Sequence, residues 1–481
     1  MRLTWAIVSW VVASLIACAA LFFFEAGIVL KPLARSVEPQ EDAFFARLAA
    51  AATPSPFERF VLVDIDDAAW AAINPPSNGR AAPARPADRA ALAADLNALR
   101  AASGKPAVVV VDIDVSPPAS DDPTRLAAQE AALTAALTAW RDDREAPLLM
   151  LVRGEACASP PGAGYDSTAR SVGLWRTSPY DALAAPSSKA PTNIAWVCAL
   201  HAPGQDGLAR RAALWGCATP ADTPDGAPFG LPSPGLMARW VETNAGAAPA
   251  SRFFAARGDL IDRACRADAR ASAELAPAPT APVAFRFEYP PAEGAPLARV
   301  RAGADVGAWA QEGRFRNAAV IIGQTHRAAG DRWNTPVAAA MPGAVLVAAH
   351  LDTATRFETA RPLPGWQRYG LVVGACLIFT IAFFVADFVR ARLAAAMGDR
   401  PSGRAMAAFL LNPTSLAIWL TAGATTLLSM LLVGQQAFGS WAAFVYAFAA
   451  ANLVLTVVGY MKAATGAPIT KAARPTGEDD G

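Results

Sequence analysis

Charged residues are scarce in this sequence. Asp, Glu, Lys and Arg make up 17% of the 481 residues and apolar residues 54%, whereas ordinary soluble domains have about 25% and about 45–50%. The apolar excess lies in long runs near both ends of the chain, which excludes a purely soluble protein. The 42 basic and 41 acidic residues leave a net charge of +1. This balance excludes a broad surface for polyanions, so we expect no nucleic-acid partner.

The residues and motifs of common catalytic sites are also few. The chain has three histidines and six cysteines, and it lacks the Gly-x-Ser-x-Gly, His-Glu-x-x-His and P-loop patterns. No two cysteines have the Cys-x-x-Cys spacing of a zinc site. We therefore expect no catalytic residues and interpret the protein as a non-enzyme.

Four apolar runs of membrane-spanning length predict four transmembrane helices. They cover residues 3–24, 369–388, 415–434 and 441–460. At 1.5 Å per residue, each can cross a hydrocarbon core of about 30 Å. The first run contains small residues that would fit a signal-peptidase or lipoprotein cleavage site. Because the run continues beyond those positions, a retained anchor is favoured.

The distribution of arginine predicts the orientation of these helices. The loop 389–413 carries four arginines and one aspartate, which makes it cytoplasmic by the positive-inside rule. Three basic residues in the polar tail 461–481 place that tail, predicted to be disordered, on the same side. Both termini are then cytoplasmic, and residues 25–367 form a domain on the periplasmic side of a bacterial inner membrane.

Alternating strand and helix patterns in residues 25–367 predict an α/β domain. Residues 60–67 and 107–114 are β-branched runs that end in acids, and residues 88–104 between them have helical spacing. The two strands should be parallel and adjacent. A helix at 123–140 and a strand at 148–152 continue the alternation, which favours a doubly wound, mostly parallel sheet.

A hairpin should be inserted in this sheet, and four cysteines lie in the same domain. Strand-like residues 193–200 and 210–217 flank the turn signal 204–207. Cys157, Cys198, Cys217 and Cys265 are expected to form disulfides in an oxidising compartment, with three pairings available. The near-symmetric placement of Cys198 and Cys217 about the turn favours their pairing, which leaves Cys157 with Cys265.

Six short motifs occur in an order that resembles a known family. They are residues 63–67, the strand ending at Asp112, and residues 206–211, 322–325, 330–336 and 341–343. The chain resembles the type 2 CHASE domains, sensory extracellular domains associated with cyclases and histidine kinases, over most of residues 40–360. One helix before the domain and three after it also fit that family. The resemblance implies an extracytoplasmic sensor whose ligand is not defined.

Carboxylates follow two strands of the predicted sheet at the point where each strand ends. Asp64, Asp66 and Asp67 end the first strand, and Asp112 and Asp114 end the second. Ligands bind at this edge of open α/β sheets. Asp64, Asp66, Asp112 and Asp114 could hold Ca²⁺ or Mg²⁺, or the cluster could bind a cationic ligand. The structural alternative is that these carboxylates cap helices or pair with arginines.

The loop after the strand 318–323 should supply a second group of site residues. Its candidates are Thr325, His326, Asp331, Arg332 and Thr335, because the loop emerges at the same sheet edge. His326 is the histidine best placed to sense pH. Alternatively, Asp331 and Arg332 pair with each other and shape the loop.

Three functions are compatible with these patterns. The favoured hypothesis is a membrane-anchored sensor that binds a ligand or protein outside the cell. Because residues 461–481 alone follow the last predicted span, we expect the signal to pass to a separate partner protein. The alternatives are a structural subunit of a membrane complex and a periplasmic metal-dependent enzyme. Gly370 and Gly374 form a GxxxG pattern that would allow a homodimer.

The predicted orientation can be tested with reporter tags. Tags at the N-terminus, at Gly403 and at Gly481 should all report cytoplasm, because the arginine-rich loop and the basic tail are retained on that side. A periplasmic signal at Gly403 would contradict the predicted arrangement.

Overall fold

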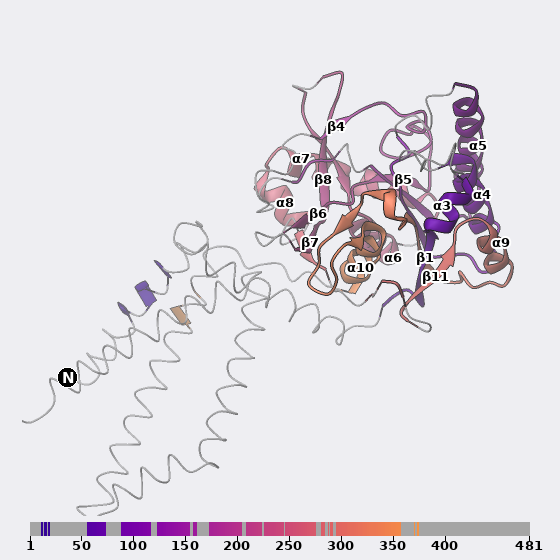
Figure 1. Cartoon of the computed structure of the whole chain (residues 1–481). Helices are drawn as coiled ribbons and strands as arrows, with labels where there is room; N and C mark the ends of the chain where they lie inside the picture. Colours follow the sequence, from indigo (N-terminus) through magenta and orange to yellow (C-terminus); the bar gives the residue numbers. More distant parts are fainter. Residues whose placement is uncertain are drawn as a thin grey trace, which may run out of the picture. The chain divides into compact units, whose positions relative to one another are not determined.

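The computed structural model describes most of the chain between residues 55 and 356 (Figure 1). The described ranges are 55–73, 88–116, 123–153, 157–160, 173–203, 208–223, 226–244, 246–275, 280–283, 287, 289–291 and 295–356, with a few residues in 11–19 and 370–374. The described strands and helices α3 to α10 belong to one compact unit, Pro39–Thr359.

The four membrane-spanning segments predicted from sequence lie almost entirely outside the described residues. Within the described ranges, no helix is both long and apolar enough to cross a membrane. The spans 3–24, 369–388, 415–434 and 441–460 therefore stay predictions from the sequence.

Six parallel strands form the central sheet of the described unit, in the order β11-β1-β12-β2-β3-β5. Their bounds are β1 Arg59–Ile65, β2 Val108–Asp112, β3 Leu148–Val152, β5 Ile194–Val197, β11 Leu297–Arg301 and β12 Ala318–Gln324. The expected parallel α/β sheet is confirmed. Continuous runs such as Val108–Val111 suit strands that are covered on both faces.

The expected adjacency of β1 and β2 is wrong, because β12 lies between them. β12 pairs with β1 on one side and with β2 on the other. Val320, Ile321 and Ile322 are fully buried, so this strand needs neighbours on both sides and helices on both faces. The connection from β1 to β2, which includes α4, therefore crosses the position of β12.

Helices cover both faces of the sheet. The bounds are α3 Asp67–Ile73, α4 Arg89–Arg100, α5 Pro123–Asp142, α6 Pro234–Thr243, α7 Pro249–Cys265, α8 Ala269–Leu275, α9 Ala304–Gln311 and α10 Gly343–Arg356. Alternate residues of each strand point to opposite faces. Val61 and Val63 therefore pack in the core with α4, α5 and α9, whereas Phe60 and Leu62 pack in the core with α6, α7 and α10.

The hairpin insertion is smaller than the sequence suggested. The expected first arm, residues 193–200, contributes β5 to the central sheet. The hairpin itself joins β6 (His201–Pro203) to β7 (Ala209–Ala213), with β10 (Thr280–Pro282) against β7. The remaining short strands are β4 (Leu174–Trp175), β8 (Trp215–Pro220) and β9 (Phe229–Pro232) in one sheet, and β13 (Arg332–Trp333) with β14 (Met341–Pro342) in another.

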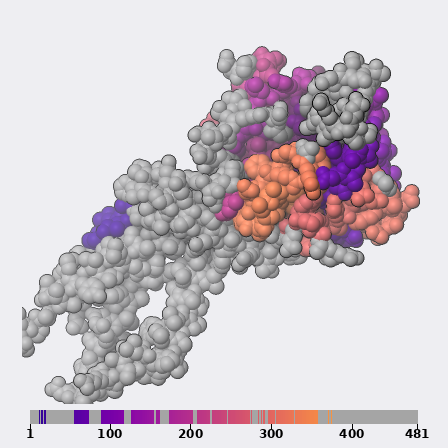
Figure 2. All heavy atoms as spheres, viewed as in Figure 1, coloured from indigo at the N-terminus to yellow at the C-terminus, as the bar shows by residue number. Residues whose placement is uncertain are grey.

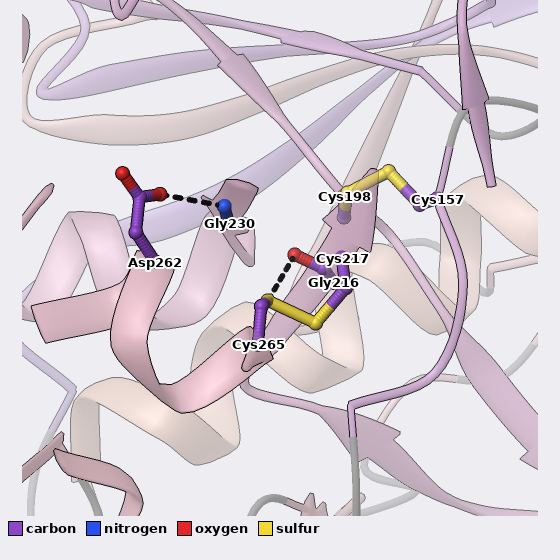
Figure 3. The surroundings of a disulfide bond; sticks show 7 residues. All are labelled: Cys157, Cys198, Gly216, Cys217, Gly230, Asp262 and Cys265. Carbon is purple, nitrogen blue, oxygen red and sulfur yellow. Dashed lines mark hydrogen bonds between the residues drawn. A yellow bond between two sulfur atoms is a disulfide. The ribbon is translucent and has the colours of Figure 1, made fainter. Parts of the chain in front are cut away.

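The two disulfides join Cys157 to Cys198 and Cys217 to Cys265, so the expected pairing of Cys198 with Cys217 is wrong. A β-carbon placed on Gly216 would lie 2.6 Å from Cys198 Sγ. Position 216 of β8 therefore faces Cys198, and the next residue, Cys217, faces the other way toward α7. Figure 3 shows Cys198 beside Gly216 and Cys217 bonded to Cys265 of α7.

Gly216→Ala should destabilise the fold by about 1–3 kcal/mol, because the new methyl group would overlap the Cys198 sulfur in a packed core. Gly307→Ala in α9 is the matched control. Nothing lies within 4 Å of a β-carbon at that position, and alanine is the better helix former. Thermal denaturation of the full-length chain in detergent measures both. Equal melting temperatures for the two variants would contradict the packing at Gly216.

Candidate functional site

The carboxyl ends of β11, β1, β12 and β2 lie together at one edge of the sheet. The strand register sets Asp64 of β1 beside Gly323 of β12, and Gly323 beside Asp112 of β2. Asp64 and Asp112 are therefore two strand spacings apart, about 9–10 Å. The aspartates at the end of β1 and those at the end of β2, which were predicted to converge, therefore belong to separate clusters.

The carboxylate of Asp64 is fully buried and accepts hydrogen bonds from two different segments. The Thr325 hydroxyl, just after β12, donates to Oδ1, and Arg299 Nε of β11 donates to Oδ2 at 2.5 Å. The Tyr289 hydroxyl in turn donates to Thr325 Oγ1 at 2.7 Å. Burial raises the pKa of Asp64 despite the hydrogen bonds from Thr325 and Arg299, which lower it.

Asp66 extends this arrangement toward solvent. Arg299 Nη2 and Arg301 Nε donate to its Oδ2 at 3.0 and 3.3 Å, and the Ala69 backbone N–H donates to Oδ1 at 2.8 Å. Partial burial acts to raise the pKa of Asp66, but the Ala69 and arginine contacts outweigh it, so this pKa is lowered. We call Asp64, Asp66, Tyr289, Arg299, Arg301 and Thr325 the Asp64 network.

Asp112 forms its own cluster with Asp331. Burial and the charge of Asp331 raise the pKa of Asp112 to about 8, and burial also raises the pKa of Asp331. Trp333 Nε1 donates to Asp331 Oδ1 at 2.7 Å. A β-carbon on Gly343 would collide with the Asp331 carboxylate, so the pair adjoins the first residue of α10. Asp112 therefore holds its proton near neutral pH.

The other residues predicted for the site have local structural partners. Asp114 Oδ1 accepts hydrogen bonds from the backbone N–H and hydroxyl of Ser116, at 2.9 and 2.5 Å. Asp67 Oδ1 accepts the Arg327 backbone N–H at 2.9 Å. Both aspartates therefore have hydrogen-bond partners within the fold.

Three residues of the loop after β12 hold that loop in place. Arg332 donates to the carbonyl oxygens of Thr325 and Ala340, at 2.5 and 3.1 Å, instead of pairing with Asp331. Thr335 shapes a turn through two hydrogen bonds with Ala338. The ring of His326 is stacked on Trp70 of α3, with centroids 4.1 Å apart. Burial lowers the pKa of His326, although the charge of Asp67 opposes the shift.

The four candidate metal ligands do not come together in the described part of the chain. No group of three or more His, Cys, Asp or Glu side chains in the described ranges could hold a metal ion. Asp64 and Asp66 are neutralised by Arg299, Asp112 lies two strands away, and Asp114 is bonded to Ser116. The register and the arginines thus remove the unpaired charge that the sequence suggested.

Sequence reasoning missed Arg299, Arg301 and Tyr289. The two arginines alternate along β11, a short edge strand that was not expected, so their side chains share one face of the sheet. An Arg-x-Arg pattern in a strand-like run was the available signal. Tyr289 is brought to Thr325 only by the fold.

A family model for the CHASE2 domain matches residues 15–384. The chain belongs to the CHASE2 domain family. Comparison with curated proteins and with solved structures gave no match. In this CHASE2 domain, the carboxyl ends of β1 and β2 hold Asp64 and Asp112, and the start of α10 adjoins Asp331.

The Asp112–Asp331 pair of this CHASE2 domain should make stability depend on pH above neutrality. The folded chain holds the Asp112 proton up to about pH 8, whereas an unfolded aspartate loses it near pH 3.9. The free energy of unfolding therefore falls as pH rises through this window, by about 1 kcal/mol between pH 7 and pH 8.5. Asp112→Asn should abolish the fall, which melting of the full-length chain at both pH values measures.

The buried histidines do not cause this fall, and one control variant isolates it. Burial lowers the pKa of His201 and His350 to about 4 and about 3, so they act with the opposite sign and only below about pH 6.5. Asp114→Asn should retain the wild-type fall. A fall of the same size in Asp112→Asn would show that the coupled pair is not its source.

Proposed function

We propose that this protein is a membrane-anchored sensor whose residues 25–367 lie in the periplasm and bind a ligand or protein at the carboxyl edge of the central sheet. Membership of the CHASE2 family supports a sensory extracellular domain. The observation that carries the choice of edge is the Asp64 network, which connects β1, β11, the residue after β12 and Tyr289 through one buried carboxylate.

Such a network suits a sensor because its parts cannot move independently. Asp64 is 0% exposed while Arg301, at the outer end, is 53% exposed. A bound group that drew Arg301 away from Asp66 would change the charge balance around Arg299, which bridges Asp66 and Asp64. An event at the surface thereby reaches a buried position between strands.

Helix α10 is the proposed route from this edge to the membrane. Its first residue adjoins Asp331, and Ala344, Val345 and Val347 are buried in the core beneath the sheet. Its last residue, Arg356, precedes the predicted second span at residue 369 in the sequence. We propose that a shift at the helix start is carried along α10 toward that span, and from there to a signalling partner.

The sensor is preferred to a periplasmic metal-dependent enzyme because Arg299 contacts both Asp64 and Asp66, two of the candidate metal ligands. The alternative of a structural subunit is addressed by the experiment below, which asks what accompanies the chain in its own membranes.

Affinity purification of the tagged full-length chain from native membranes should recover a signalling enzyme, such as a histidine kinase or a cyclase. Thr325→Val removes the hydroxyl between Tyr289 and Asp64 at nearly constant volume, so it should alter the activity of that enzyme without releasing it. Thr243→Val, on the exposed end of α6, is the matched control and should leave activity unchanged. Recovery of a large stoichiometric assembly with no signalling enzyme would favour the structural subunit instead.

A further inference from the structure

A pocket of about 300 Å³ lies beside the Asp64 network and shares one residue with it, Arg301. Its walls come from the end of β1, from α3 and α4, and from the connection between β11 and α9. Figure 1 shows α3 and α4 close to β11 and α9. In the space-filling view, the indigo atoms of the segment with β1 and α3 lie next to orange and salmon atoms of residues 295–356 (Figure 2). The volume is at the small end of ligand sites.

The pocket combines apolar walls with one buried carboxylate. Ile65, Trp70 and Leu92 supply apolar surface. Asp95 of α4 also lines the pocket and is only 4% exposed. Both of its carboxylate oxygens accept the same donor, the backbone N–H of Gly303, at 3.0 and 3.2 Å. Nothing cationic in the described part of the chain pairs with it, and burial raises its pKa to about 6.

The other charged residues of the pocket, Asp88 and Arg301, form hydrogen bonds within the fold. Asp88 caps α4 by accepting the N–H groups of Ala90 and Ala91, and it also accepts Gln129 Nε2. Arg301 donates to Asp66. Asp95 is therefore the carboxylate of the pocket that a ligand could pair with, because a buried carboxylate is strongly stabilised by a hydrogen-bonded cation.

We propose that this pocket binds a small organic amine, with its ammonium group on Asp95 and its apolar body against Ile65, Leu92 and Trp70. The apolar walls exclude a bare metal ion, which requires several oxygen ligands, and the negative charge excludes an anion. Trp70 adds an aromatic surface suited to a cation.

The pocket also has a physical connection to the rest of the site. Trp70 lines the pocket and is stacked on His326, which follows Thr325 of the Asp64 network. The binding itself does not depend on a sensory role; only the use of the amine as a signal rests on the proposed function.

Three probes that share a phenethyl group test the assignment on the full-length chain in detergent by isothermal titration calorimetry. They are phenethylamine, the neutral 2-phenylethanol and the anionic 3-phenylpropionate. We expect phenethylamine to bind at least about tenfold more tightly than the alcohol, a difference of about 1.4 kcal/mol, and the propionate not to bind. Because the amine requires ionised Asp95, its affinity should fall as pH drops below about 6.

Two variants separate charge from shape. Asp95→Asn should remove the preference for the amine while its side-chain oxygen still accepts the Gly303 N–H. Ala91→Phe, which fills the pocket from α4, should prevent all binding. Asp259→Asn on the exposed surface of α7 is the matched control and should bind as the wild type does.

The proposal is overturned if no probe binds, if the alcohol or propionate binds as well as the amine, or if Asp95→Asn retains the amine preference. If Asp95→Asn does not fold, the test rests on two other results: the loss of binding in Ala91→Phe and the fall of amine affinity at low pH. Such failures concern the pocket and leave the proposed sensory function standing. If the amine binds but does not change the activity of the co-purified signalling enzyme, the amine site is supported and the use of the amine as a signal is contradicted.

Discussion

The insertion of β12 between β1 and β2 is the constraint on which the described structure depends. β12 follows β1 by more than 250 residues in the sequence, yet it pairs with β1 over seven positions and with β2 over five. Its side chains are buried on both faces. β1 and β2 do not pair with each other. The centre of the sheet is therefore complete only when β12, the last of its six strands in the chain, lies between them. The loop after β12 reaches the carboxyl edge for the same reason.

Once β12 is in place, the chemistry of that edge follows from which carboxylate finds which partner. Asp64 can be buried because Thr325 and Arg299 satisfy both of its oxygens. Removing one partner of a buried ion pair typically costs about 3–5 kcal/mol. Asp112, on the other side of Gly323, has another carboxylate for its neighbour and retains a proton instead. Asp64 and Asp112 thus lie on either side of Gly323, but Asp64 forms an ion pair with Arg299 whereas Asp112 adjoins a second carboxyl group, that of Asp331.

The two disulfides show how the same geometry acts farther along the chain. Cys157 and Cys198 belong to the core with α4, α5 and α9, whereas Cys217 and Cys265 belong to the core with α6, α7 and α10. Gly216 leaves room for Cys198 Sγ on one face of β8 (Figure 3). Each disulfide therefore stabilises a different one of the two core layers. A pairing of Cys198 with Cys217 would require both side chains to lie on the same face.

Local patterns determined much of this protein from the sequence alone. The β-branched runs of β1, β2 and β3, the Asp88 cap and the leucine spacing of α4, and the resemblance to CHASE2 domains all rest on neighbouring residues or short motifs. The sequence also showed that acids gather where strands end. Periodicity and capping are local properties, so these features needed no knowledge of the rest of the fold.

Only the tertiary structure decided which of these acids meet and what neutralises them. Arg299 and Tyr289 reach the Asp64 network from segments with weak local signals, and Asp331 reaches Asp112 from a loop more than 200 residues away. Strand order and disulfide pairing were likewise wrong or open at the level of sequence. The physical reason is that the pairing of distant strands depends on the burial of whole strand faces. The residues next to a given position in the chain do not indicate which distant strand it will pair with.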